Sequence, residues 1–131
     1  NKYFNNGAIG TATNKPLYWS DSKNFTRILT LVDMFKSADA FNQDVSSWDL
    51  STATNLSTMF GNALLFNNGG VSLNWAGGFG NNANLFFMFG YTSAFNQDIS
   101  DWDVTNVTNM ERMFLTSTAY NNGGVALDWS N

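Results

Sequence analysis

The stretch Phe41-Asn-Gln-Asp-Val45 returns as Phe95-Asn-Gln-Asp-Ile99, 54 positions further along the chain. The residues around this phrase return at the same distance, so that segments 34–75 and 88–129 agree at 21 of 42 aligned positions. Two unrelated segments would not agree at half of their positions. The chain is therefore a tandem repeat, and a repeat of this length predicts units that stack on one another to bury a shared core.

Each 54-residue unit consists of two shorter units. A Met-Phe pair marks every short unit and recurs after 25, 29 and 25 residues, at Met34-Phe35, Met59-Phe60, Met88-Phe89 and Met113-Phe114. One type of unit continues with Phe-Asn-Gln-Asp and Trp-Asp, the other with Phe/Tyr-Asn-Asn-Gly-Gly-Val and Leu-x-Trp. We expect a single repeat domain, 1–131, with both ends inside a repeat. Its parts are a degenerate first turn at 1–27 and units around 28–52, 53–81, 82–106 and 107–131.

The composition excludes several kinds of functional site. No Cys and no His occur among the 131 residues, which excludes disulfides, thiol nucleophiles, the usual zinc sites and imidazole acid–base chemistry. Residues 1–36 hold five basic and two acidic side chains (+3), residues 37–131 hold one basic and eight acidic side chains (−7), and the sum is −4. An acidic chain with few basic residues is not typical of a nucleic-acid-binding protein. In a linear stack, this distribution gives a positive head and a negative tail.

The spacing of apolar residues predicts one short helix in each unit. In residues 31–41, the apolar positions fall at offsets of 3, 4, 7 and 10 from Leu31, which places them on one side of a helix. Polar stretches such as Ser51-Thr-Ala-Thr-Asn55 precede these segments and can cap the helix start. The expected helices cover 31–41, 56–66, 85–95 and 110–120.

A short alternating run in each unit predicts a strand. Trp48-Asp49-Leu50 and Trp102-Asp103-Val104 alternate apolar and polar side chains with period two. Strands this short are stable only when they pair with their counterparts in neighbouring units. The predicted fold class is an α/β solenoid, a leucine-rich-repeat-like right-handed coil in which each turn supplies a short helix and a short strand of a parallel sheet.

In such a coil, each landmark side chain stacks on its own copies. One predicted column of the stacking core holds the tryptophans Trp48, Trp75, Trp102 and Trp129. Another column holds Phe41, Phe66, Phe95 and Tyr120. A polar column of Asn42, Asn67, Asn96 and Asn121 follows at the turn, where side-chain amides can satisfy the backbone of adjacent turns.

The phrases Ala40-Phe-Asn-Gln-Asp-Val-Ser-Ser-Trp-Asp-Leu50 and Ala94-Phe-Asn-Gln-Asp-Ile-Ser-Asp-Trp-Asp-Val104 resemble the BspA-type leucine-rich-repeat surface proteins. That family has repeats of about 25 residues and was formerly a domain of unknown function in mycoplasma-type lipoproteins. The resemblance covers residues 28–129 and implies a secreted or surface-anchored solenoid that acts in adhesion without catalysis. The chain departs from the pattern in its Asn-Asn-Gly-Gly units, in the insertion 77–82 and in residues 1–27.

Acidic residues at the turns leave two interpretations open. Asp98, Asp101 and Asp103 could supply oxygen ligands to calcium, but no glycine-bearing calcium loop of standard spacing accompanies them, which favours solvated turn acids. A catalytic carboxylate pair is normally built once in a cleft, whereas these acids recur in equivalent turns. We therefore predict no cofactor and no enzymatic activity.

Both ends of the array resemble interior units, although stacked repeats need polar terminal units. The apolar residues expected to make an end-to-end contact are Tyr3, Phe4, Leu127 and Trp129. This pattern predicts head-to-tail continuation into further repeats of the same polypeptide or into an identical subunit. No apolar run long enough to insert in a membrane occurs. The first hypothesis is thus a non-enzymatic solenoid, extracellular or at the cell surface, with a structural or adhesive role.

The second hypothesis is a module that binds a glycan or a host protein. In the predicted coil, polar side chains point outward from the exposed sheet face and form an acidic and amide stripe. The residues of this stripe are Asp49, Asn74, Asp103 and Asp128.

Overall fold

The computed structural model describes residues 30–129. Regular elements within this range are short. Two strands, β1 (Ala83–Asn84) and β2 (Val107–Asn109), pair in parallel, and two 3₁₀ helices, η1 (Asn68–Gly70) and η2 (Asn122–Gly124), cover the Asn-Asn-Gly-Gly phrases. Isolated parallel bridges join Thr30 to Asn55 and Asn55 to Asn84. The bridges and strands together form a narrow parallel ladder across four consecutive units.

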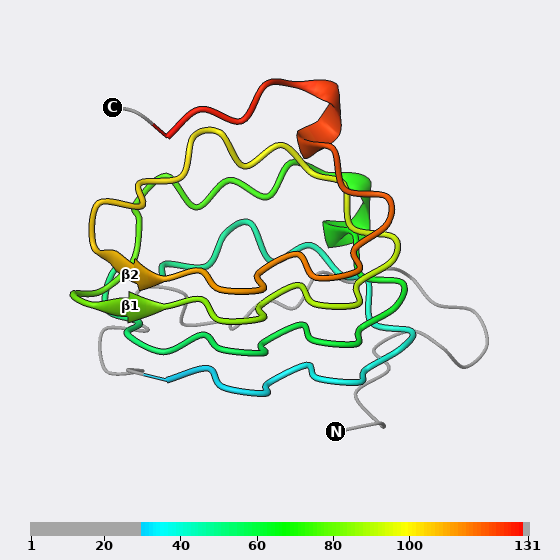
Figure 1. The fold of residues 1–131 in the computed structure, drawn as a ribbon, viewed down its shortest axis with the longest axis horizontal. Helices are drawn as coiled ribbons and strands as arrows, with labels where there is room; N and C mark the ends of the chain where they lie inside the picture. The colour runs from blue at the N-terminus through cyan, green and yellow to red at the C-terminus, as the bar shows by residue number, and fades with distance from the viewer. Residues whose placement is uncertain (1–29, 130–131) are drawn as a thin grey trace.

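Four turn-rich segments lie side by side on one wall of the molecule (Figure 1). We call them rungs 1 to 4; they are residues 30–41, 55–66, 84–95 and 109–120. The chain returns from one rung to the next through segments 42–54, 67–83 and 96–108, which lie opposite the rungs and form a second wall, above the rungs in Figure 1. The core lies between the two walls.

Alternate backbone amides of each rung bind the next rung. In rung 1, the amides of Leu31 and Phe35 donate to the carbonyls of Asn55 and Met59 at 2.7 and 2.8 Å, and the amides of Asp33 and Ser37 continue the row. Rungs 2 and 3 repeat this pattern with four amides each. The amides in between close tight turns within the rung, as when Ala38 donates to Phe35 at 3.0 Å. Each rung is therefore joined to its neighbour as strands are joined in a parallel sheet.

The structure differs from the sequence prediction at the expected helices. None of residues 30–129 is α-helical, and segments 31–41, 56–66, 85–95 and 110–120 are successions of turns. Asp33 and Ser37 have φ of 57° and 56°, a left-handed conformation that an α-helix cannot contain. The turns bring the chain back to the core every three or four residues, so the apolar spacing imitates a helix. In rungs 1 to 3, half of the amides donate to the neighbouring rung and therefore cannot form the hydrogen bonds of a helix.

The expected strands are also displaced. Residues 48–50 and 102–104 form no strand, and the parallel pairing lies instead at β1 and β2, where the chain enters the rungs. Burial still alternates at the predicted positions, since Trp48 and Leu50 are buried and Asp49 is exposed. The amide of Ser51 donates to the side chain of Asp49 at 3.0 Å, so the backbone is satisfied locally rather than by a ladder.

Eight aromatic rings form two parallel columns through the core. Within a rung, the two rings stack face to face, as Phe60 does on Phe66 at 3.9 Å between centroids. Between rungs, the rings repeat at closely similar distances, with 5.7 Å from Phe41 to Phe66 and 5.9 Å from Phe66 to Phe95. The column continues to Tyr120, 5.8 Å from Phe95. This spacing follows the separation of hydrogen-bonded backbones, which lie just under 5 Å apart in a sheet.

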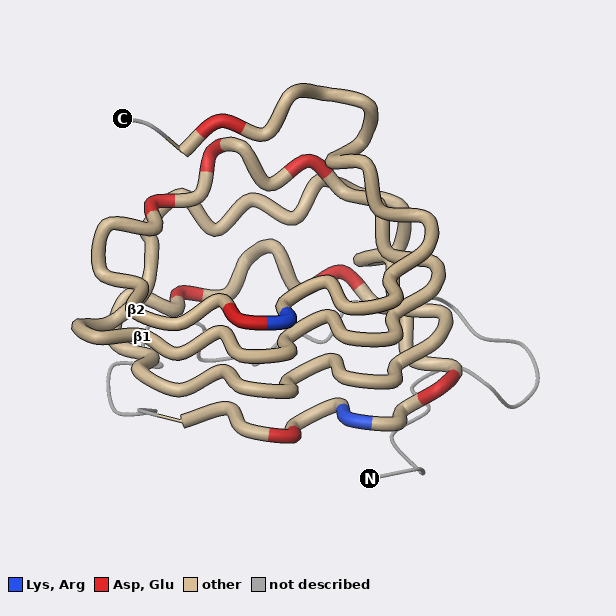
Figure 2. The backbone as a smooth tube through the Cα atoms, viewed as in Figure 1, with Lys and Arg blue, Asp and Glu red and all other residues tan. Residues whose placement is uncertain are grey.

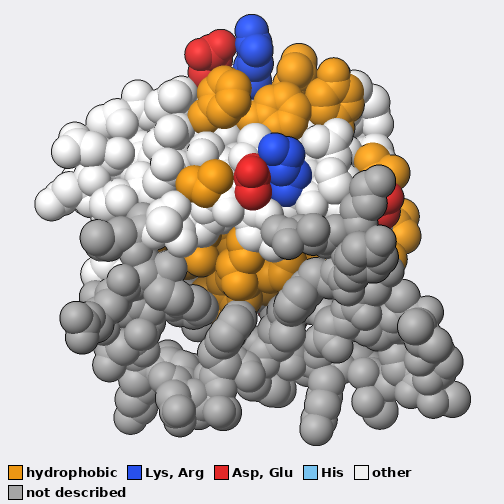
Figure 3. Space-filling model, turned by 90° about the horizontal axis from the view of Figure 1, so that it is seen from below, with side chains coloured by type: hydrophobic (Ala, Val, Ile, Leu, Met, Phe, Trp, Pro, Cys, Tyr) orange, Lys and Arg blue, Asp and Glu red, His pale blue; other side chains and the backbone are white. Residues whose placement is uncertain are grey.

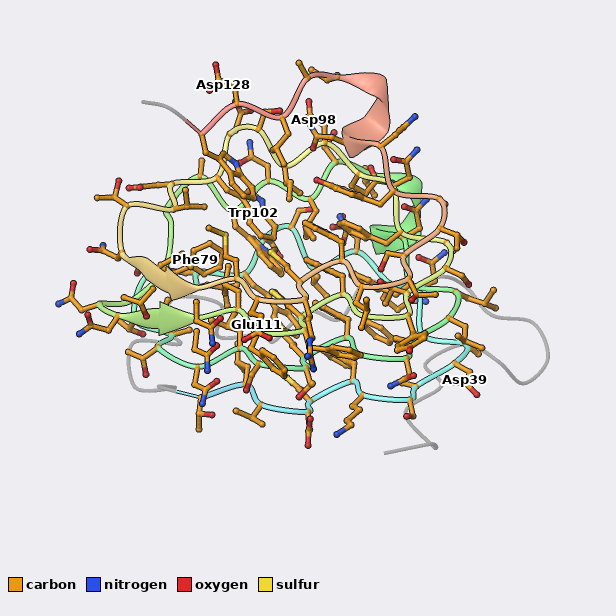
Figure 4. The ribbon with its side chains drawn as sticks, viewed as in Figure 1. Asp39, Phe79, Asp98, Trp102, Glu111 and Asp128 are labelled. Atoms are coloured by element: carbon orange, nitrogen blue, oxygen red, sulfur yellow. The ribbon has the colours of Figure 1, made fainter. Side chains whose placement is uncertain are left out.

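The insertion at 77–82 packs into the core through Phe79. This side chain is 3% exposed and meets the edges of Trp75 and Trp102 at 6.3 and 5.3 Å between centroids. Phe79 and Trp102 both point into the interior (Figure 4). A Cβ at Gly80 would lie 2.8 Å from the carbonyl oxygen of Thr52, so only glycine permits this close approach.

Candidate functional site

The asparagine column is a continuous hydrogen-bond ladder at one edge of the rungs. Asn42 Oδ1 accepts the amide of Asn67 at 2.8 Å, Asn67 Oδ1 accepts the amide of Asn96 at 2.9 Å, and Asn96 Oδ1 accepts the amide of Asn121 at 2.9 Å. At the last member, the geometry changes: Asn121 Oδ1 accepts the amide of Gly124 in its own turn at 2.9 Å. Asn42, Asn67 and Asn96 thus each bond the following unit, whereas Asn121 bonds its own turn.

A second pair of asparagines lies inside the fold, and the sequence reasoning missed it. Asn68 and Asn122 are 0% and 3% exposed. Their Oδ1 atoms accept the amides of Val45 and Ile99 at 2.8 and 2.9 Å, and each Nδ2 also donates to a serine hydroxyl. Only the units with Asn-Asn-Gly-Gly carry this second asparagine. The alternation of two unit types is the sequence signal for this second asparagine. An Asn-Asn-Gly-Gly unit always follows an Asn-Gln-Asp unit, and its second asparagine accepts a backbone amide of that preceding unit.

The tryptophans are structural. Trp48, Trp75 and Trp102 are at most 5% exposed, and Trp129 is half-buried against the core. The indoles of Trp75 and Trp102 stack at 5.0 Å. The indole Nε1 of Trp102 donates to the carbonyl of Leu73 at 2.7 Å, and Trp75 and Trp129 donate to carbonyls of the preceding units at 3.1 Å. Each of these three side chains therefore ties its unit to an earlier one.

The four residues of the proposed binding face are all exposed, as predicted for Asp49, Asn74, Asp103 and Asp128. The amide two residues further on donates to the side-chain oxygen of Asp49, Asn74 and Asp103 at 2.9 to 3.0 Å. Hydrogen bonds from the hydroxyl and amide of Ser51 lower the pKa of Asp49. Those from the amide and hydroxyl of Thr105 lower the pKa of Asp103. The face is therefore negatively charged at neutral pH. In Asp49, Asn74 and Asp103, one side-chain oxygen already accepts a backbone hydrogen bond.

Two hollows lie beside this face at equivalent places in the 54-residue unit. The larger measures about 550 Å³ and is lined by residues 100–105 and Trp129. The smaller measures about 210 Å³ and is lined by residues 47–50 and 74–78. The lining of each includes a tryptophan and an aspartate, Trp129 and Asp103 in the first and Trp75 and Asp49 in the second. Hollows of this size can hold a small ligand, and both are partly open to solvent.

A family model described as "Mycoplasma protein of unknown function, DUF285" matches residues 13–78 and again residues 74–131. The chain belongs to the DUF285 family. The two adjacent matches confirm that the chain is a tandem repeat. A search of the curated proteins and a search of the solved structures each found no match.

The structure of this DUF285 chain does not bring the three calcium candidates together. Among residues 30–129, no three acidic side chains are arranged to hold a metal ion. Asp98 Oδ1 accepts the amide of Ser100 at 2.9 Å, and this bond lowers the pKa of Asp98. Asp98 and Asp128 point away from the core (Figure 4). Within the same range, no helix is long and apolar enough to cross a membrane.

The residues predicted for the end-to-end contact are only partly described. Tyr3 and Phe4 lie outside residues 30–129. Leu127 is 40% exposed, and Trp129 is half-buried with its Nε1 bonded to the carbonyl of Ile99. At this end, Leu127 is the more available apolar side chain.

A partly exposed aromatic cluster on rung 3 was not predicted from the sequence. The ring of Phe87 lies 6.0 Å from Phe86 and 5.7 Å from Tyr91, which is 43% exposed. Phe87 and Tyr91 have φ of 54° and 58°. A Cβ at Gly90 would overlap the Phe87 ring, so the ring can occupy this position only because residue 90 is glycine. Hydrophobic side chains gather between two pairs of opposite charge on the surface seen in Figure 3.

Proposed function

We propose that this DUF285 chain is a non-enzymatic extracellular element with a structural or adhesive role, built as a BspA-type, leucine-rich-repeat-like right-handed solenoid. Its adhesive role would consist of presenting the outer faces of a stiff rod. Membership of a repeat family supports the proposal, and so does the way in which the repeated side chains are used.

The asparagine ladder is the observation that carries this proposal. The side-chain oxygens of Asn42, Asn67 and Asn96 each accept a hydrogen bond from a backbone amide of the following unit. A side chain held for catalysis or for ligand binding keeps its reactive atoms directed at a cleft. In this chain, these recurring asparagines hold one unit to the next. This arrangement favours a structural role, in which stacked units form an extended rod.

Each added unit stabilises the stack by the same set of contacts. Rungs 2 and 3 are joined by four amide bonds, by stacked rings such as Phe60 on Phe89 at 5.5 Å, and by the bond from Asn96 to Asn67. In stacked repeats, stability is approximately the sum of unit terms and nearest-neighbour interface terms. A rod of this kind can therefore extend without a change in its cross-section.

Immunoelectron microscopy of the source cells, with antibodies raised against this chain, tests the proposal directly. We expect label outside the cell membrane, on rod-like projections or on the cell surface. Label confined to the cell interior would refute an extracellular role. Cells that lack the gene should lose the label, and their adhesion to host cells should fall.

Binding of a glycan or of a basic host protein is the second candidate function. The hollow lined by Asp103 and Trp129 favours it, because an aromatic ring can contact the apolar side of a sugar and a carboxylate can accept hydrogen bonds from its hydroxyl groups. A glycan array probed with and without calcium should give hits that weaken in Asp103→Ala, whereas Asp39→Ala, on an exposed site in rung 1, should bind as the parent does. An array without hits in either condition would remove this candidate.

A further inference from the structure

The outer surface of rungs 2 and 3 carries no charged side chain. Segments 55–66 and 84–95 contain no Asp, Glu, Lys or Arg, and Figure 2 shows both rungs uncharged between the charged rungs 1 and 4. Each of these two rungs is hydrogen-bonded to a rung on either side, so the surface lies within the stack and not at one of its edges. A partner of this surface is therefore selected by shape and by uncharged groups.

Rung 3 places three aromatic rings on this uncharged surface. The aromatic cluster consists of Phe86 and Phe87, which are partly exposed, and Tyr91, which is 43% exposed. The ring centroids of Phe86 and Phe87 lie 6.0 Å apart, and those of Phe87 and Tyr91 lie 5.7 Å apart. The three rings thus form one continuous apolar surface.

The repeat itself provides a comparison for two of these rings. Phe87 and Tyr91 have φ of 54° and 58°, and every rung has positive φ at the same two positions. Polar residues occupy these positions in the other rungs, namely Asp33 and Ser37, Thr58 and Asn62, and Arg112 and Thr116. The backbone of a rung therefore requires no aromatic residue at either position. Exposed rings at positions that are otherwise polar indicate a role in binding.

Two glycines fix the position of the Phe87 ring. A Cβ added at Gly90 would lie 2.4 Å from Cε1 of Phe87, and one added at Gly61 in rung 2 would lie 3.4 Å from its Cδ1. The ring therefore lies over the backbone of both rungs. A side chain that is already ordered loses little conformational entropy when a ligand binds. The cluster is thus preorganised for a partner that rests flat on it.

Two uncharged polar groups border the rings. The side-chain amide of Asn62 and the hydroxyl of Tyr91 form no hydrogen bond with any other residue of the described range 30–129. Asn62 and Tyr91 occupy equivalent positions in adjacent rungs, and the backbone amide of Asn62 donates to the carbonyl of Gly90 at 2.8 Å. An amide and a hydroxyl can each donate and accept hydrogen bonds. The cluster therefore combines aromatic faces with neighbouring groups that suit the hydroxyls of a ligand.

We infer that the aromatic cluster binds an uncharged glycan. Aromatic rings contact the apolar face of a sugar, and the Asn62 amide and Tyr91 hydroxyl can bond its hydroxyl groups. A peptide strand finds no free edge here, because the amides of rung 3 donate to rung 4 and its carbonyls accept amides of rung 2. Nucleic acid finds no basic side chain in rungs 2 and 3.

The inference rests on the proposed function, since it names the ligand class that an adhesive surface would recognise. The cluster is separate from the hollow lined by Asp103, which lies on the opposite wall.

A printed array of uncharged, sialylated and sulfated oligosaccharides, read over a range of protein concentrations, tests the inference. We expect the parent to bind uncharged oligosaccharides. Phe87→Thr and Tyr91→Asn introduce the residues that rung 2 carries at the same positions, where φ is 53° and 59°. Each substitution should weaken binding about three- to ten-fold, and the double variant should weaken it about ten-fold or more.

Val71→Thr is the matched control, because it changes a 48% exposed apolar residue on the opposite wall and should bind like the parent. Thermal unfolding checks that each variant folds. If the double variant does not fold, Tyr91→Asn alone decides the test, since this side chain is exposed. An array without uncharged hits, or uncharged hits that the folded variants leave unchanged, would overturn the inference.

Other occupants of the cluster give distinct results. Hits lost in Asp103→Ala but kept in the double variant would assign glycan binding to the hollow and overturn the inference. Self-association of the parent that is lost in the double variant, on an array without hits, would show that the cluster binds a second copy of the chain.

The two proposals fail in different ways. A chain that labels the cell surface but binds no uncharged glycan overturns the inference and leaves the proposed function in place. A chain that binds uncharged glycans through the cluster but is found inside the cell supports the inference and removes the extracellular role.

Discussion

Replacing Asn68 with glycine and, separately, with alanine tests whether a buried asparagine holds two units together. The side chain is 0% exposed. Its Oδ1 accepts the amide of Val45 at 2.8 Å, and its Nδ2 donates to the Ser46 hydroxyl at 2.8 Å and to the carbonyl of Val71 at 2.9 Å. Val45 is also 0% exposed, so water does not replace the lost acceptor without entering the core.

Two separate costs follow from this geometry. Asn68→Gly leaves the amide of Val45 unsatisfied, which costs about 1 to 3 kcal/mol for a buried donor. Asn68 has a φ of 49°, a left-handed conformation that alanine adopts only at an additional cost of about 1 to 2 kcal/mol. We therefore expect Asn68→Ala to lower the free energy of unfolding by about 2 to 5 kcal/mol. Asn68→Gly should lower the free energy of unfolding by about 1 to 3 kcal/mol, because glycine adopts the left-handed conformation freely.

Urea unfolding followed by the fluorescence of the five tryptophans measures both values. Asn62 supplies the matched control, because its φ is 59° but its side chain makes no hydrogen bond within residues 30–129. Asn62→Gly should leave stability nearly unchanged, and Asn62→Ala should show only the conformational cost. A loss below about 0.5 kcal/mol in Asn68→Gly, the range of ordinary surface substitutions, would refute the role given to this side chain.

Three further predictions follow from the same structure. Phe95→Ala removes a fully buried ring stacked between Phe66 and Tyr120 and should lower the free energy of unfolding by about 3 to 5 kcal/mol, again read from urea unfolding; a loss under about 1 kcal/mol would contradict the stacked core. Gly80→Ala should destabilise more than Gly90→Ala, because the new Cβ at 80 meets the backbone of Thr52, whereas at 90 it meets only the partly exposed ring of Phe87; melting temperatures in the opposite order would argue against this packing. Burial and the charge of Asp98 raise the pKa of Tyr120 to about 12. The stability that the protonated Tyr120 contributes is therefore present below pH 10 and should be lost as the pH rises from 10 to 12. The melting temperatures of the parent and of Tyr120→Phe should diverge across that range, and a constant difference between them would exclude the shift.

Burial was easier to predict from the sequence than hydrogen bonding. The sequence placed Phe41, Phe66 and Phe95 in one column, and the structure has all three at 0% exposure. It also predicted a ladder through Asn42 and its counterparts, and the structure contains those bonds. Both predictions depend only on the repeat, because residues one period apart occupy equivalent places in any stacked arrangement.

The backbone conformation between those landmarks was not predictable in the same way. Apolar spacing in 31–41 suits a helix and also suits successive tight turns, since both return to the core every three or four residues. The two differ in where the amides of Leu31, Asp33 and Phe35 donate, and the acceptors lie in the next rung. A pattern within one segment contains no information about an acceptor about 24 residues away.

The sequence by itself determined the repeat, its period, the column from Phe41 to Tyr120 and the lack of Cys and His, because these follow from residue identity and from recurrence. Tertiary structure alone decided that the rungs are turns rather than helices, that Asn68 and Asn122 join neighbouring units from inside, and that Phe79 fills a space between two tryptophans. The physical reason is that a rung's backbone amides can be satisfied within the rung or by its neighbour. Only the neighbour's position, set by the packing of the whole stack, decides between the two.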